Sequence, residues 1–184
     1  MDQLLGELEV LRSRVREQEI RLKYLESLTK GIDAKIDEKV GDAITTFIAY
    51  GVDEQTKGLG AGERAAVLHS YKTAFGKLPE TEAEFSDALK IASGRFPDQR
   101  SEEAEDRARE QFRRIYIRPD QIDNARDTNA IVIMAYGIRQ SSQKRNLVSE
   151  RRALKTFRRI YKRLPKSTED WNIIQAITYS GAAR

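Results

Sequence analysis

The chain has 184 residues, of which 34% are charged and 39% hydrophobic, and its formal net charge is +4 at pH 7. This composition is typical of soluble helical and coiled-coil proteins. The absence of cysteine excludes disulfides and thiolate catalysis. Because the sequence contains a single histidine, it offers no usual set of zinc ligands, and we expect neither a metal nor a cofactor.

No run of apolar residues is long enough to cross a membrane, so we expect no transmembrane segment. The first residues also lack the basic and apolar regions of a signal peptide. The sequence therefore favours a cytoplasmic location. The cell surface is the alternative, if a signal is removed during maturation.

A seven-residue pattern of apolar residues begins at Leu4, and charged residues of both signs flank its two seam positions. The spacings alternate between four and three, as a coiled coil requires. We expect a coiled coil over 1–31 and a homo-oligomer formed through 4–29. Packing of this stripe on the chain's own later helices is the alternative, and the pattern does not decide the stoichiometry. The seam residues are Leu4, Leu8, Leu11, Val15, Gln18, Leu22 and Leu25.

An internal repeat with a period of 43 residues follows. It is marked by the dipeptides Tyr50-Gly51, Ser93-Gly94, Tyr136-Gly137 and Tyr179-Ser180. An aromatic pair four residues apart, then a basic residue and a proline, precedes each of the last three dipeptides. These pairs are Tyr71/Phe75, Phe112/Tyr116 and Phe157/Tyr161. We expect a half repeat at 32–51, with only a second helix, and full repeats at 62–95, 101–138 and 145–181.

Each full unit predicts a helix, a proline turn and a second helix. Aromatics four residues apart share one helix face, and proline cannot continue the first helix. Thr81 and Thr168 are the expected N-caps of second helices, and the glycines at 51, 94 and 137 suit the position after a helix end.

A unit this small cannot bury its apolar face alone, so neighbouring units must pack together. The predicted fold class is all-α: an N-terminal coiled-coil helix followed by three helical hairpins of about 43 residues, in a short α-solenoid or a helical bundle. The last helix, which ends near Arg184, has no visible polar cap. We therefore expect it to leave a face open for a partner.

The motif aromatic-x-x-Ile-Tyr-x-Arg-Leu-Pro, followed by Asp-Trp and then Ile-x-Tyr-Gly, resembles helical repeats of uncharacterised bacterial proteins, some of them at the cell surface. The resemblance covers about 44–181. It implies helical repeats but no activity, and it carries over no functional residue. The middle unit departs from the pattern, because it lacks the Leu-Pro pair and the tryptophan.

Residues that commonly carry catalysis form no recognisable constellation. His69 lacks the spacing of a catalytic triad, a metal site or a phosphate loop, so a surface or half-buried helical residue is favoured over a general base. The acids of 102–110 are expected at a helix N-terminus, where the helix dipole favours negative charge. Trp171 aligns with Phe85 and is expected to pack in the core rather than to form a ligand platform. We predict that the protein is not an enzyme.

The segment 139–166 contains eleven basic residues and one acid. Such a concentration predicts either a solvated helix face or a site for an anionic partner, such as an acidic protein surface, a nucleic acid or a cell-wall polymer. The candidate face comprises Arg151, Arg152, Lys155, Arg158, Arg159, Lys162 and Arg163. The sequence therefore predicts a structural, assembly or adaptor protein. A nucleic-acid-associated protein that contacts the phosphate backbone is the alternative.

Overall fold

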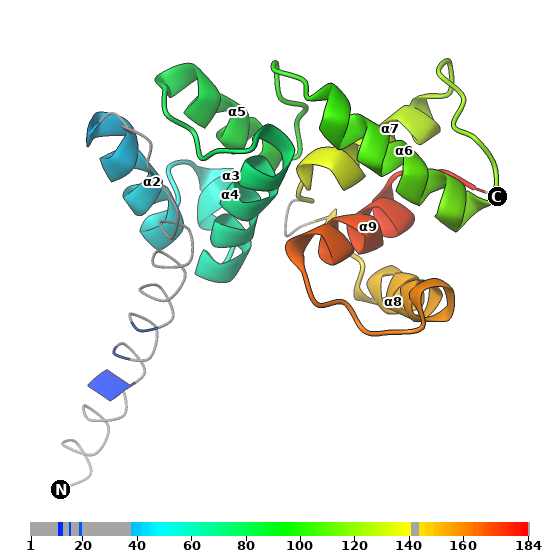
Figure 1. The fold of residues 1–184 in the computed structure, drawn as a ribbon. Helices are drawn as coiled ribbons and strands as arrows, with labels where there is room; N and C mark the ends of the chain where they lie inside the picture. The colour runs from blue at the N-terminus through cyan, green and yellow to red at the C-terminus, as the bar shows by residue number, and fades with distance from the viewer. Residues whose placement is uncertain (1–10, 13–14, 16–18, 20–37, 141–143, 184) are drawn as a thin grey trace, which may run out of the picture.

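The computed structural model describes residues 11, 12, 15, 19, 38–140 and 144–183 (Figure 1). Over these residues it contains eight helices and no strands, which confirms the predicted all-α class. In the same part of the chain, no helix is both long and apolar enough to span a membrane.

The helices follow one another as α2 (Glu38–Tyr50), α3 (Glu54–Lys57), α4 (Ala61–Phe75), α5 (Glu82–Ala92), α6 (Glu102–Tyr116), α7 (Ala125–Tyr136), α8 (Leu147–Tyr161) and α9 (Thr168–Tyr179). Helix α4 packs on α5, α6 on α7, and α8 on α9. The three pairs occupy the predicted hairpin segments, except that α4 begins one residue earlier. That these pairs are copies of one unit stays a prediction, and residues 32–37 of the half repeat lie outside the described residues.

Hydroxyl side chains determine where two of the second helices begin. Thr81 caps α5 by accepting a hydrogen bond from the backbone N–H of Glu84, which confirms the predicted cap. In α9 the cap is Ser167, which accepts from the backbone N–H of Asp170. The prediction of Thr168 was wrong by one residue, because adjacent Ser and Thr are both good caps and the pattern does not distinguish them.

The aromatic pairs supply the largest side chains of the core. Within each pair the ring centroids lie 4.4 to 4.5 Å apart, and the first ring of each pair is fully buried. A spacing of four residues therefore places both rings on the buried side of the helix. Phe75 also stacks on Tyr136 of α7 at 5.6 Å, which joins the first hairpin to the second.

Helices α4, α7 and α9 meet at a buried junction of small and polar groups. Asn172 of α9 donates from Nδ2 to Ser70 Oγ of α4 at 3.1 Å, and both side chains are buried. Gly137 ends α7 with a φ of 69°, and a Cβ there would lie 2.5 Å from Asn172 Oδ1 and closer still to Ser70 Oγ. This junction joins the first and last hairpins. In a linear solenoid each hairpin contacts only its neighbours, so the contacts favour the helical bundle.

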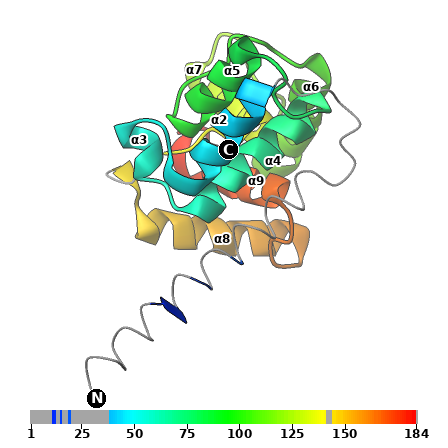
Figure 2. The same cartoon turned by 90° about the vertical axis from the view of Figure 1, so that its left-hand side faces the viewer.

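Helix α9 lies inside the bundle, where it packs against α4, α7 and α8. Ser180 is buried after the helix end, and Arg118 donates from Nε to the carbonyl of Ala183 at 3.0 Å. The expectation of an open end of the last helix was therefore wrong, because the segment that follows α9 returns onto the second hairpin. Both views show α8, not α9, at the edge of the bundle (Figures 1 and 2).

Candidate functional site: the basic face of α8 and the cleft beside it

Helix α8 begins at Asn146, whose side chain accepts hydrogen bonds from the backbone N–H groups of Val148 and Ser149. Of its fifteen residues only Ala153 and Phe157 are buried. Helices α4 and α6 have the same length, but they bury seven and six residues. The first helix of the last hairpin therefore leaves most of its surface open.

Six residues of the predicted anionic-partner face form one exposed stripe along this helix. At about 100° per residue they fall within an arc of about 120°, and they extend for about 17 Å along the axis. None of the six forms an ion pair with a residue that the structure describes. Within the described part of the chain, the stripe is therefore a concentrated positive charge that no acid neutralises through an ion pair. Its residues are Arg151, Arg152, Lys155, Arg158, Arg159 and Lys162.

The seventh predicted residue, Arg163, forms an ion pair within the chain. Its Nη1 and Nη2 donate to the two carboxylate oxygens of Asp170 at 2.5 and 2.8 Å. These bonds lower the pKa of Asp170, which also accepts from the backbone N–H of Lys166 at 2.7 Å. The guanidinium also lies over the Phe157 ring at 5.5 Å. Arg163 therefore secures the turn between α8 and α9 and is not an open cation of the stripe.

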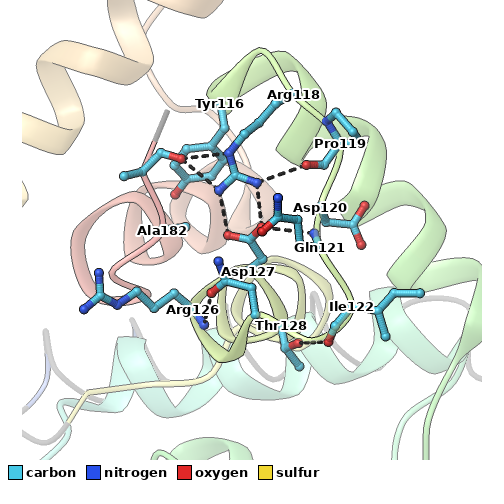
Figure 3. A network of polar contacts seen from close by, with 12 residues as sticks. Tyr116, Arg118, Pro119, Asp120, Gln121, Ile122, Arg126, Asp127, Thr128 and Ala182 are labelled. Atoms are coloured by element: carbon cyan, nitrogen blue, oxygen red, sulfur yellow. Dashed lines mark hydrogen bonds and ion pairs between the residues drawn. The ribbon is translucent and has the colours of Figure 1, made fainter.

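A similar cation–carboxylate clamp closes the other two hairpins. Arg118 donates to both carboxylate oxygens of Asp127, at 2.6 and 2.8 Å, and Asp127 also accepts from the backbone N–H of Gln121 (Figure 3). In the first hairpin, Lys77 forms an ion pair with Glu84 at 2.8 Å. A recurring pattern in the sequence could have predicted these cation–carboxylate clamps. A basic residue before the proline and an acid early in the next helix recur in all three units.

A cleft of about 600 Å³ lies beside the stripe, between α4, α8 and α9. Its apolar lining comes from Leu147 and Leu154 of α8 and from Trp171 and Ile174 of α9. Trp171 is 47% exposed, so its predicted place in the core was wrong. The aligned Phe85 of the first hairpin is buried, because α2 covers it with the edge of the Phe47 ring.

Arg139 also lines this cleft, and its side chain is deeply buried. The residue is 7% exposed, and its Nε and Nη2 have no hydrogen-bond partner among the described residues. Burial disfavours the charged form and lowers the pKa of Arg139 to about 10. An unpaired buried charge costs several kcal/mol. The sequence placed Arg139 in the basic segment but gave no sign that it differs from its exposed neighbours.

Arg145 joins α4 to α8 at the same cleft. It pairs with Glu63 of α4 at 2.8 Å and with Glu150 of α8 at 2.9 Å. The hydrogen bond with Glu150 raises the pKa of Arg145 and lowers that of Glu150. Both acids of the cleft are thus occupied by one arginine. The other cations of the lining, Arg139, Arg151 and Lys166, leave it with a net positive charge.

His69 lines the cleft from α4. Burial, together with the charge of Lys72, lowers the pKa of His69 from its ordinary value of 6.5, so the imidazole is neutral at about pH 7. Nowhere in the described part of the chain do three or more histidine or acidic side chains gather as a metal site would require. The chemistry that this arrangement favours is the binding of an anion.

Two of the predicted seam residues, Leu11 and Val15, lie in the described part of the chain. Both are helical, and they are 55% and 53% exposed. Their side chains are therefore accessible to a partner helix. The remaining seam residues, Leu4, Leu8, Gln18, Leu22 and Leu25, lie outside the described residues, and the coiled coil stays a prediction.

No known protein family, curated protein or solved structure matches this chain.

Proposed function

We propose that this chain is a non-enzymatic assembly or adaptor protein that self-associates through its N-terminal coiled coil and presents helical-repeat surfaces to other proteins. The observation that carries the proposal is the open surface of α8. An outermost helix that buries two of its fifteen residues leaves room for a partner. The uncompensated stripe along it favours a partner with an acidic surface.

The recurrence of local geometry supports three repeated hairpins. Each hairpin has an aromatic pair of nearly the same ring separation on its first helix. Each also has a cation at the end of the first helix that clamps an acid in the first turn of the second. Because core packing and turn closure recur together, a shared structural unit accounts for the 43-residue period better than coincidence does.

The self-association is tested by placing charge in the seam. Replacing Leu11 and Val15 together by aspartate removes two apolar contacts per helix and introduces charges that repel their copies in the partner. We expect the dissociation constant of the oligomer to rise at least ~100-fold, which corresponds to about 2.7 kcal/mol. Sedimentation equilibrium over a concentration series measures this change, and circular dichroism monitors the helical content.

The matched control carries Arg12→Gln and Glu19→Gln, two changes in the same segment that leave the seam intact. We expect its dissociation constant to stay within ~3-fold of the wild-type value, as is usual for exposed charges. If the aspartate variant associates as tightly as the control, self-association does not use this seam.

A second candidate function is the binding of nucleic acid through the phosphate backbone. It is favoured by the same six cations, because their alignment on one helix face allows several phosphates to be contacted at once. Oligomerisation would multiply such weak contacts into useful avidity. The contacts would carry no sequence information, since phosphate contacts position a protein but do not specify bases.

This second candidate predicts strongly salt-dependent binding. If all six cations contact phosphates, affinity for a fluorescein-labelled DNA duplex should fall about 10³-fold between about 50 and 200 mM salt. Replacing Arg152, Lys155 and Arg159 together by glutamine removes half of the contacts, so the slope of log affinity against log salt should be roughly halved. Fluorescence anisotropy measures both slopes.

The control for charge alone replaces Lys57, Arg95 and Arg113 by glutamine. These are exposed cations outside the stripe, and they should leave the salt slope close to that of the wild type. Absence of binding at about 50 mM salt, or equal slopes for the two triple variants, would rule out this candidate and leave the protein-binding role.

A further inference from the structure

The cleft beside α8 combines three chemically distinct walls. Arg139 offers two buried guanidinium nitrogens, Nε and Nη2, and Gln175 offers a buried Oε1 acceptor, and none of these atoms has a hydrogen-bond partner among the described residues. The third wall is an apolar surface that includes Trp171. We propose that this cleft binds the C-terminal carboxylate of a partner chain whose last side chain is apolar, with Arg139 as the counter-ion of the carboxylate. The inference specifies a partner for the proposed adaptor function and rests on it.

The charge of the cleft favours a single carboxylate. The unpartnered atoms of Arg139, Nε and Nη2, belong to one edge of the planar guanidinium, which matches a carboxylate in a bidentate pair. Glu63 acts electrostatically on Arg139, and that acid would repel a doubly charged phosphate more strongly than a monoanion. An ion pair with a bound carboxylate would offset the cost of burying Arg139 without a partner.

Gln175 indicates that the ligand carries a hydrogen-bond donor next to its carboxylate. Its buried Oε1 can only accept a hydrogen bond, so a fitting ligand brings an N–H or O–H donor. The last peptide N–H of a protein chain lies next to the terminal carboxylate and supplies such a donor. We therefore assign both groups of the cleft to one ligand segment, the last peptide unit with its carboxylate.

The apolar residues account for the last side chain of the ligand. Leu147 and Trp171 are largely exposed in the free protein, and Leu154 and Ile174 lie beside them in the lining. A cleft of about 600 Å³ lies within the range of ligand sites and is large enough for a short chain end. The nitrogens Nε and Nη2 of Arg139 are covered in the free protein, so the ion pair forms when the guanidinium turns toward the cleft and meets a chain terminus that enters end-on.

Trp171 is the only tryptophan of the chain, so its fluorescence reports on this cleft directly. The probe is the peptide acetyl-Gly-Ser-Gly-Ala-Leu with a free C-terminal carboxylate, titrated into the full chain. We expect a saturable change with a dissociation constant on the order of 10–100 µM, as for a small interface. The same peptide with an amidated C-terminus should bind at least ~10-fold weaker, since its charge and one acceptor oxygen are lost.

Two variants test the groups that the proposal uses. Arg139→Met should weaken binding of the free-acid peptide at least ~10-fold without lowering the melting temperature, because it removes an unpaired buried charge. Gln175→Leu should weaken binding ~3-fold or more, and it keeps the proposal testable if the first variant does not fold. Arg152→Met is the matched control, since Arg152 is exposed on α8 and does not line the cleft. Its affinity should equal that of the wild type.

The proposal is overturned if the free-acid peptide gives no saturable change up to about 1 mM, since a specific site of this size binds more tightly. It is also overturned if amidation or Arg139→Met leaves the affinity unchanged. Equal binding of inorganic phosphate would identify an unspecific oxyanion site, and equal binding of N-acetyl-leucine would identify a small-molecule site. The fluorescence titration measures peptide binding to the cleft of each protomer. A negative result is therefore distinguishable from a loss of self-association, which sedimentation equilibrium measures.

Discussion

Replacing Gly137 by alanine should lower the free energy of unfolding by about 3 kcal/mol. Forcing a side chain into the left-handed region costs about 1–2 kcal/mol, and overpacking a filled site costs about as much again. The new Cβ would lie 2.5 Å from Asn172 Oδ1 and would displace the hydrogen bond that joins α4 to α9. For a chain of this size the melting temperature should fall by about 6–12 °C, as calorimetry would measure.

Gly76→Ala is the matched control for this substitution. Gly76 also has a positive φ, of 78°, but a Cβ there would meet no atom within 4 Å. We expect it to cost only the conformational part, about 1–2 kcal/mol. If the two substitutions lower the melting temperature equally, the junction of the three helices does not constrain residue 137 as described.

Replacing Asp127 by asparagine should lower the free energy of unfolding by about 2 kcal/mol. The side chain of Asp127 is fully buried, and its carboxylate accepts two hydrogen bonds from Arg118 and one from the backbone. Asparagine keeps the shape but leaves the guanidinium without its charged partner. The figure lies below the range for fully buried pairs, because Arg118 is partly exposed. Urea unfolding measures the difference.

The pH dependence of this difference identifies its cause. Hydrogen bonds from Arg118 lower the pKa of Asp127 from its ordinary value of 3.8, so the unfolded chain takes up a proton before the folded chain does. The stabilisation is therefore complete above about pH 5 and is lost as the pH falls through the folded pKa. Wild type and variant should converge only when the pH falls below the lowered pKa that Asp127 has in the folded chain.

Asp106→Asn serves as the control for the removal of an ion pair. Asp106 pairs with Arg109 at 2.6 Å, but its side chain is largely exposed, so the change should cost less than about 0.5 kcal/mol. Equal costs for the two substitutions, or a gap for Asp127 that does not depend on pH, would contradict the assigned role of the clamp.

The sequence predicted the helices well because its signals were local. The aromatic spacing of four residues, the proline turns and the glycines each act within one or two turns of chain. They therefore indicate helix ends without knowledge of the fold. The one error among the caps, Thr168 for Ser167, is a choice between two adjacent residues of similar capping strength.

The arrangement of the hairpins could not be predicted in the same way. The junction of Ser70, Gly137 and Asn172 joins residues up to 102 positions apart, and no local pattern indicates that these positions meet. For the same reason the last helix was expected at an open end, although it lies inside the bundle. Trp171 was expected in the core because it aligns with Phe85, but only the first hairpin has α2 to cover that position.

The candidate site was predicted only in part. The basic stripe of α8 followed from the count of cations and their helical spacing, but the clamp of Arg163 and the burial of Arg139 depend on contacts with other helices. A single arginine code letter does not distinguish an exposed cation from one in an ion pair or one in a cleft wall. The ability of an arginine to bind an external anion differs among these three environments.

The most direct test of the account is the mass of the full chain in solution, measured by light scattering at concentrations well above micromolar. The chain has a mass of 21.1 kDa, and an assembly protein built on a coiled coil should give an integral multiple of it, two or more. The seam substitutions at Leu11 and Val15 should return the mass toward that of one chain. A single species of 21.1 kDa for the wild-type chain at these concentrations would contradict the proposed self-association.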